Sequence, residues 1–137
     1  MSDERDRLAI ARGYPPEAHH VLCVDFDGTL YPWGYIDDEP EPLPGAIEAM
    51  QRLKAHGFRI VIFTSRLSPA WLASAGYDAA AMREKVERLL NRDGIPFVDI
   101  TGEKIAAQAY IDDRAIRFDG DWPPIVDWLL WSSHESP

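Results

Sequence analysis

The stretch HVLCVDFDGTL, residues 20–30, decides the fold expected for this chain. It begins as a continuous β-prone apolar run and ends in acidic residues, a pattern typical of a central parallel strand that is buried on both faces. Three further apolar runs predict strands, at 58–63, 96–99 and 109–111. Apolar residues at helical spacing predict helices at 45–56, 78–91 and 125–131.

Strands that alternate with helices through short connections are typical of an α/β fold with a mostly parallel central sheet. The 137 residues suffice for one such domain and not for two independent cores. We expect this domain to span residues 20–131, with a polar tail at 132–137. Residues 1–19 are expected to form a peripheral, loosely docked arm, because Gly13 and the following prolines stop any helix that begins there.

The composition indicates which partners and which cellular location to expect for this protein. The net charge is −9, from 23 acidic and 14 basic residues, which disfavours nucleic acid and anionic membranes without ruling out a local basic pocket. Cys23 is the single cysteine, so no internal disulfide can form. No apolar stretch approaches the roughly 18 residues needed to span a bilayer, and the first residues lack the apolar core of a signal peptide. We therefore expect a cytoplasmic protein with no membrane partner.

Polar side chains follow the predicted strands at the points where these strands end. They are Asp25, Asp27 and Thr29 after the first strand, with Gly28 between the last two; Thr64, Ser65 and Arg66 after the second; Lys104 after the third; and Asp112 and Asp113 after the fourth. The carboxyl ends of parallel strands meet at one edge of the sheet, where ligands of such folds bind. These residues therefore predict a single site.

The residue types predict phosphoryl chemistry that depends on a divalent cation. The carboxylates of Asp25, Asp112 and Asp113 are hard oxygen ligands of the kind that Mg²⁺ prefers. Asp25 could also attack phosphorus and form an aspartyl phosphate. Gly28 allows a sharp turn, so that Asp27 can face the same cavity and act as general acid and base.

Two further side chains complete this prediction. The hydroxyl of Thr64 and the ammonium of Lys104 could hold the oxygens of the transferring phosphoryl group and balance their charge. Arg66 could pair with an anionic part of the substrate or form a structural ion pair. The four histidines have no metal-ligand spacing, so we expect them to play no part in metal binding.

The ordered segments DFDGTL (25–30), IVIFTSR (60–66), Lys104 and YIDD (110–113) resemble the four motifs of the haloacid dehalogenase-like (HAD) hydrolase superfamily. The resemblance covers roughly residues 20–118. It implies a Rossmann-like, three-layer α/β/α sandwich. It also implies a magnesium-dependent enzyme, and an aspartate at position 27 is typical of the phosphatases in this superfamily.

The resemblance also implies a role for each matching residue. Asp25 matches the nucleophile and a metal ligand, and Asp27 matches the acid/base residue, whose backbone carbonyl is a second metal ligand. Thr64 and Lys104 match the phosphate-binding residues of the second and third motifs, with Lys85 as the alternative to Lys104. Asp112 and Asp113 match the metal carboxylates of the fourth motif, and we expect Asp112 to contact the metal directly. Residues Gly28, Thr29, Ser65 and Arg66 are expected to line the substrate site.

The spacing of the motifs leaves no room for a cap domain. Thirty-six residues separate Asp27 from Thr64, and 39 separate Thr64 from Lys104. Because helices and strands of the sheet use most of both intervals, we expect an open site. The aromatic loop 30–35, the segment 67–77 or a second subunit could cover it. The tryptophans near the end of the chain could pack the last helix or form a dimer patch.

These observations predict a Mg²⁺-dependent phosphomonoester hydrolase acting on a small phosphorylated metabolite or nucleotide. One alternative is a phosphatase acting on the end of a polynucleotide, which the net charge mildly disfavours. Another is a non-catalytic, Mg²⁺-binding phospho-acceptor module such as a receiver domain. In receiver domains, however, the acidic pair comes first and the lysine last, whereas here the nucleophile candidate Asp25 leads and Lys104 precedes the final acidic pair.

Overall fold

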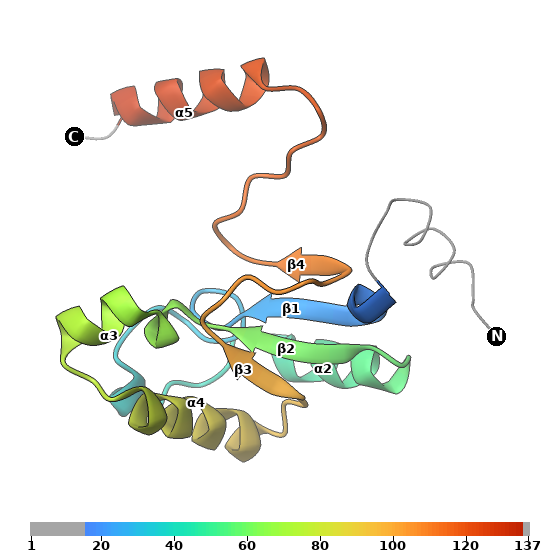
Figure 1. Ribbon diagram of the computed structural model, residues 1–137, viewed down its shortest axis with the longest axis vertical. Helices are drawn as coiled ribbons and strands as arrows, with labels where there is room; N and C mark the ends of the chain where they lie inside the picture. Colours follow the sequence, from blue (N-terminus) through green and yellow to red (C-terminus); the bar gives the residue numbers. More distant parts are fainter. Residues whose placement is uncertain (1–15, 136–137) are drawn as a thin grey trace.

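The computed structural model describes residues 16–135, with side chains from 17 to 132 (Figure 1). The elements in chain order are η1 (Pro16–Ala18), β1 (Val21–Asp25), η2 (Ile36–Asp38), α2 (Ala46–Ala55), β2 (Arg59–Phe63), η3 (Ser65–Leu67), α3 (Pro69–Ala75), α4 (Ala79–Asp93), β3 (Asp99–Thr101), β4 (Ala109–Ile111) and α5 (Pro123–Glu135), where η marks a 3-10 helix. No helix in this part of the chain is long and apolar enough to cross a membrane.

The four strands form one parallel sheet in the order β3-β2-β1-β4. β1 is buried at all five positions, as expected for a central strand. Asp25 pairs in register with Phe63 of β2, and Phe63 pairs with Thr101 of β3. The predicted α/β class with a parallel sheet is therefore confirmed, and the ends of β1, β2 and β3 meet at one edge.

Helices α2 and α4 cover one face of this sheet. Right-handed crossovers that step in the same direction, from β1 to β2 and on to β3, place their helices on the same side. The resulting core takes alternate strand residues and the inward-facing residues of both helices: Leu22, Val24, Ile60, Ile62, Ile100, Met50, Met82, Val86, Leu89 and Leu90. Cys23 and Val61 lie at the intervening strand positions and are also buried.

The third strand is shorter than predicted, and one helix was not predicted. The third strand begins at Asp99 rather than at residue 96, because Pro96 has no N–H to donate and the Phe97 side chain packs against the core. The segment 67–77 contains a helix, α3, that the apolar periodicity did not indicate. The start of α3 is instead marked by local features. The Ser68 hydroxyl accepts a hydrogen bond from the backbone N–H of Trp71 at 3.3 Å, and a proline occupies the first turn of the helix.

The two ends of the described chain differ in how they lie relative to the sheet. Residues 1–15 of the predicted peripheral arm lie outside the described residues, whereas Ala18 of η1 is buried. At the other end, α5 stands apart from the sheet and is joined to β4 by an extended linker (Figure 1). Nearly all side chains from 111 to 131 are exposed.

Candidate active site

The turn after β1 is held in place by backbone hydrogen bonds. The N–H of Gly28 donates to the carbonyl of Tyr31 at 2.6 Å, and the N–H of Tyr31 donates to the carbonyl of Phe26 at 3.0 Å. Gly28 has a φ of +82°, and a Cβ at this position would lie 2.3 Å from Oδ2 of Asp113. Only glycine fits this combination of backbone angle and close approach, which confirms the predicted sharp turn.

Three carboxylates converge at this edge of the sheet. Asp25, Asp112 and Asp113 each offer an oxygen, and these oxygens all lie within 4.8 Å of one another. Asp25 is largely buried, whereas Asp112 and Asp113 are exposed. Burial, a hydrogen-bonding contact with Asp113 and the neighbouring negative charges together raise the pKa of Asp25 to about 7. The Trp33 indole, which donates to Asp113 at 3.1 Å, lowers the pKa of Asp113.

This donor set fits a magnesium ion. Carboxylate oxygens that share an octahedral Mg²⁺ at about 2.1 Å lie no more than about 4.2 Å apart. The oxygens of Asp25, Asp112 and Asp113 all lie within 4.8 Å of one another, so at most small side-chain rotations would bring them to that separation. Burial is the main cause of the raised pKa of Asp25, and the neighbouring negative charges add to it; a bound cation would offset those charges.

Asp27 is buried and held by two residues of the second motif. The Nε of Arg66 donates to both carboxylate oxygens of Asp27, at 3.0 and 3.2 Å, and a terminal nitrogen lies 2.9 Å from Oδ1. The Thr64 hydroxyl donates to Oδ2 at 3.3 Å. In turn, Oγ1 of Thr64 accepts from the backbone N–H of Arg66 at 3.2 Å. The turn after β1 and the end of β2 are therefore joined through the carboxylate of Asp27.

Arg66 also reaches the aromatic loop. Its Nη2 donates to the carbonyl of Gly34 at 2.6 Å, and its guanidinium carbon lies 5.8 Å from the ring centre of Trp71. The side chain of Arg66 is thus fixed between the loop 30–35 and α3. Its expected contact with substrate remains a prediction.

The phosphate-binding candidates occupy the same edge. Thr64 is fully buried, and its N–H donates to the carbonyl of Thr101 at 2.9 Å. Lys104 is exposed, with its ammonium 5.6 Å from the ring centre of Tyr110. Lys104 and Asp112 line a hollow of about 330 Å³. The alternative lysine, Lys85, forms an ion pair with Asp37 instead, which favours Lys104.

The remaining candidates flank this arrangement. Thr29 donates to Oδ2 of Asp25 at 3.3 Å, and Ser65 is exposed at the start of η3. The interaction of Trp33 with Asp113 was missed, although a tryptophan so close to the nucleophile motif was a signal for it. Gly102 was also missed: a Cβ there would lie 2.7 Å from the carbonyl carbon of Leu67, so this glycine lets the loop that carries Lys104 pass close to η3.

Comparisons with known proteins agree with this geometry. The chain is 33% identical over 72 residues to a phosphoglycolate phosphatase from Caulobacter vibrioides; the match covers 53% of this chain and 30% of that enzyme. The chain thus spans under a third of the curated relative's length. No family model matches.

Two solved structures share the fold. A conserved protein from Bacteroides thetaiotaomicron has a TM-score of 0.51 at 22% identity, covering 85% of this chain and 98% of that one. A target protein from Vibrio cholerae has a TM-score of 0.50 at 25% identity, covering 82% and 98%. The parallel sheet is the part of the fold that these structures share, and the convergent carboxylates lie in a chain whose sequence is similar to part of a phosphatase.

Proposed function

We propose that this protein is a Mg²⁺-dependent phosphomonoester hydrolase that uses Asp25 as its nucleophile and Asp27 as its general acid and base. The observation that carries the proposal is the placement of two kinds of carboxylate side by side. Asp25 belongs to a cluster suited to a cation, whereas Asp27, two residues along, is held by Arg66 and Thr64. Two carboxylates in different surroundings can divide the roles of nucleophile and proton carrier.

The reaction has two steps. A carboxylate oxygen of Asp25 forms a bond to phosphorus while the bond from phosphorus to the ester oxygen breaks, and Asp27 gives its proton to the departing alcohol. A water molecule then attacks the aspartyl phosphate, Asp27 takes a proton from that water, and the bond between phosphorus and Asp25 breaks. The products are the alcohol and inorganic phosphate.

The other residues orient the phosphoryl group and offset its charge. Asp25, Asp112 and Asp113, with the carbonyl of Asp27, would hold Mg²⁺, which supplies positive charge beside the phosphate oxygens. Lys104, which lines the same hollow as Asp112, would add a second positive charge. Thr64 orients Asp27 through the hydrogen bond at 3.3 Å.

The substrate is a small phosphorylated metabolite in this proposal. The relative from Caulobacter vibrioides is named for phosphoglycolate, so a small phosphorylated acid is the first compound to test. The exposed aromatic side chains of Trp33 and Tyr35 lie on the loop that Arg66 anchors. They offer one wall against which an organic group could pack.

The test is phosphate release from a panel of phosphomonoesters that includes phosphoglycolate, sugar phosphates, nucleotides and an oligonucleotide with a terminal phosphate. We expect turnover with Mg²⁺, none with EDTA, and none with Asp25→Asn. Preference for the oligonucleotide would favour the polynucleotide-end alternative. Folded, Mg²⁺-binding protein that releases no phosphate but stays phosphorylated on Asp25 would contradict the proposal and favour a phospho-acceptor module.

A further inference from the structure

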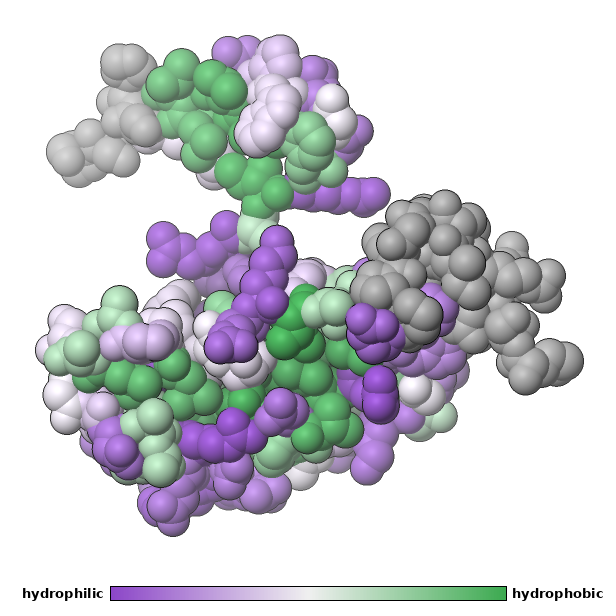
Figure 2. Space-filling model, in the orientation of Figure 1, coloured by the Kyte–Doolittle hydropathy of each residue, from purple (hydrophilic) through white to green (hydrophobic). Residues whose placement is uncertain are grey.

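The chain beyond β4 carries an apolar surface that the proposed site does not use. We call residues 116–131 the C-terminal arm; in this subsection "the arm" always means these residues. Eight of its large apolar side chains are between 44% and 63% exposed: Ile116, Phe118, Trp122, Val126, Trp128, Leu129, Leu130 and Trp131. Figure 2 shows hydrophobic residues gathered on this part of the molecule, separated from the body by hydrophilic ones.

Helix α5 is apolar around most of its circumference. Trp128, Leu129, Leu130 and Trp131 are consecutive, and at about 100° per residue four consecutive side chains point to all sides of a helix. Asp127 is the single charged side chain among the described positions 123–132. A helix with this pattern is normally enclosed by protein.

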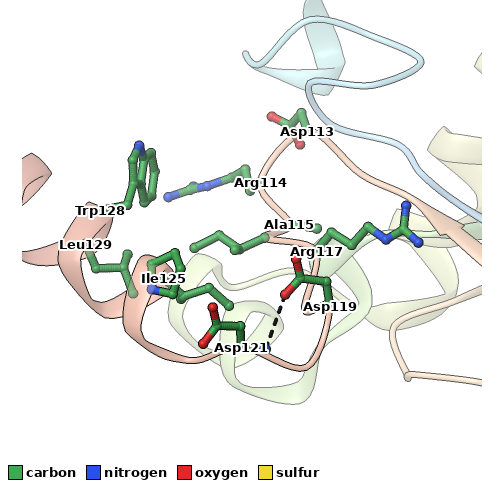
Figure 3. Close-up of a pocket in the computed structure, with 11 residues that line it drawn as sticks. Asp113, Arg114, Ala115, Arg117, Asp119, Asp121, Ile125, Trp128 and Leu129 are labelled. Atoms are coloured by element: carbon green, nitrogen blue, oxygen red, sulfur yellow. Dashed lines mark hydrogen bonds between the residues drawn. The ribbon is translucent and has the colours of Figure 1, made fainter.

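The arm also forms a hollow that could receive side chains. The linker and α5 enclose a space of about 810 Å³. Figure 3 shows Ile125, Trp128 and Leu129 on its helical side, with charged residues such as Arg114 and Asp119 on the linker side. An apolar floor with a charged rim is the usual anatomy of a protein–protein interface.

We propose that the occupant of this surface is the arm of a second copy of the chain, in a two-fold symmetric dimer. A two-fold interface brings the same patch together from both subunits, so the patch must be complementary to itself. An apolar helix meets this condition, because the same apolar side chains can pack against one another from both subunits.

The size of the patch also suits a dimer. Four of these eight side chains are aromatic, and at about 150–250 Å² each when fully buried their exposed parts amount to roughly 450 Å², to which the four aliphatic side chains add. A stable interface needs about 800 Å² per partner, and monomers rarely expose apolar patches of more than a few hundred Å². The linker begins directly after β4 with Asp112 and Asp113 of the carboxylate cluster, so the dimer would also anchor the segment that follows these residues.

Sedimentation equilibrium of the full chain tests the proposal. We expect a mass of twice 15.5 kDa at micromolar concentration. Leu130→Glu should weaken the dimer by at least about 30-fold, as loss of an interface hot spot does. Val98→Glu is the matched control, because Val98 is exposed to a similar degree, at 62% against 60%, but lies between α4 and β3. It should leave the mass unchanged.

A second variant covers the case in which Leu130→Glu fails to fold. Leu130→Cys should form a disulfide-linked dimer under mild oxidation, because the natural Cys23 is buried and cannot compete. A wild-type protein that stays monomeric at about 100 μM, or a Leu130→Cys protein that does not cross-link, would overturn the proposal. Binding of the full chain to lipid vesicles, without self-association in solution, would also overturn the proposal.

Discussion

Arg66 binds both carboxylate oxygens of Asp27 through its Nε and shares its Nη2 between Oδ1 of Asp27 and the carbonyl of Gly34. The pair is almost fully withdrawn from solvent, with 12% of the Arg66 side chain and 3% of the Asp27 side chain exposed. The proposed general acid is therefore fixed by the second motif and by the aromatic loop at once. Arg66 is best described as a positioning residue for Asp27.

Replacing Arg66 should therefore lower kcat more than it raises KM. Arg66→Lys keeps the charge but loses the forked geometry, and we expect a loss in kcat of about 10- to 100-fold because Asp27 is no longer held in place. Arg92→Lys is the control, since Arg92 also pairs with an aspartate, Asp93, at the surface of α4. A rise in KM at unchanged kcat would instead support the predicted contact between Arg66 and the substrate.

The carboxylate cluster should make the proposed binding of Mg²⁺ dependent on pH. The pKa of Asp25 is raised from 3.8 to about 7 in the metal-free protein, so the folded state holds a proton that the unfolded chain releases. This proton contributes stability that is fully present below about pH 4 and is lost as the pH rises through about 7. Mg²⁺ binds the ionised carboxylate, so its affinity should fall as the pH drops below 7.

Thermal melts with and without Mg²⁺ check this dependence. We expect Mg²⁺ to raise Tm more at pH 8 than at pH 6, because at pH 8 the ion does not compete with the proton on Asp25. Asp112→Asn should reduce the effect of Mg²⁺ at both pH values. An equal Mg²⁺ effect at pH 6 and pH 8 would contradict the assignment of Asp25 as a ligand.

Substitutions at Gly28 and Gly45 can distinguish the cost of backbone strain from the cost of a steric clash. Their φ angles are +82° and +83°, but a Cβ meets nothing within 4 Å at Gly45 and lies 2.3 Å from Asp113 at Gly28. Gly45→Ala should cost about 1–2 kcal/mol of unfolding free energy from the left-handed backbone alone. Gly28→Ala should cost more in urea denaturation, because the side chains of Asp113 and Trp33 must also move away from the new methyl group. Equal losses would contradict the packing of Asp113 against this turn.

Tyr31 connects the turn after β1 to α4. Its hydroxyl donates to Oδ2 of Asp93 at 2.7 Å and approaches the carbonyl of Leu89 at 3.1 Å, and its ring stacks on Phe26. Tyr31→Phe keeps the ring but leaves these acceptors without their donor, which should cost about 1–3 kcal/mol in urea denaturation. Tyr35→Phe, at an exposed position, should change stability by less than about 0.5 kcal/mol. Similar effects of the two changes would contradict this role for Tyr31.

Much of the fold and the site could be predicted from the sequence, because buried parallel strands leave continuous apolar runs and the site follows their ends. The structure brings Asp25, Asp112 and Asp113 together as that reasoning expected. Helix α3 was missed because it depends on the cap at Ser68 rather than on an apolar face. The pairing of Asp27 with Arg66 depends on how two strand ends face each other, which spacing along the chain does not specify.

The position of α5 could not be predicted for a related reason. Its apolar composition was visible in the sequence, but composition alone leaves open whether a helix packs on its own sheet or on another chain. Trp128 and Trp131, expected to pack the last helix or form a dimer patch, are both more than half exposed. That exposure is the basis of the dimer proposal.

The measurement that tests the central claim most directly is the detection of a phosphoryl group on Asp25 during turnover. Asp27→Asn protein would be mixed with Mg²⁺ and a reactive aryl phosphate, quenched in acid, digested and examined by mass spectrometry. Because the variant lacks the base that activates water, we expect the peptide containing Asp25 to accumulate one phosphoryl group, with none in Asp25→Asn. Wild-type turnover without any phosphoryl group on Asp25 in the Asp27→Asn protein would contradict the account.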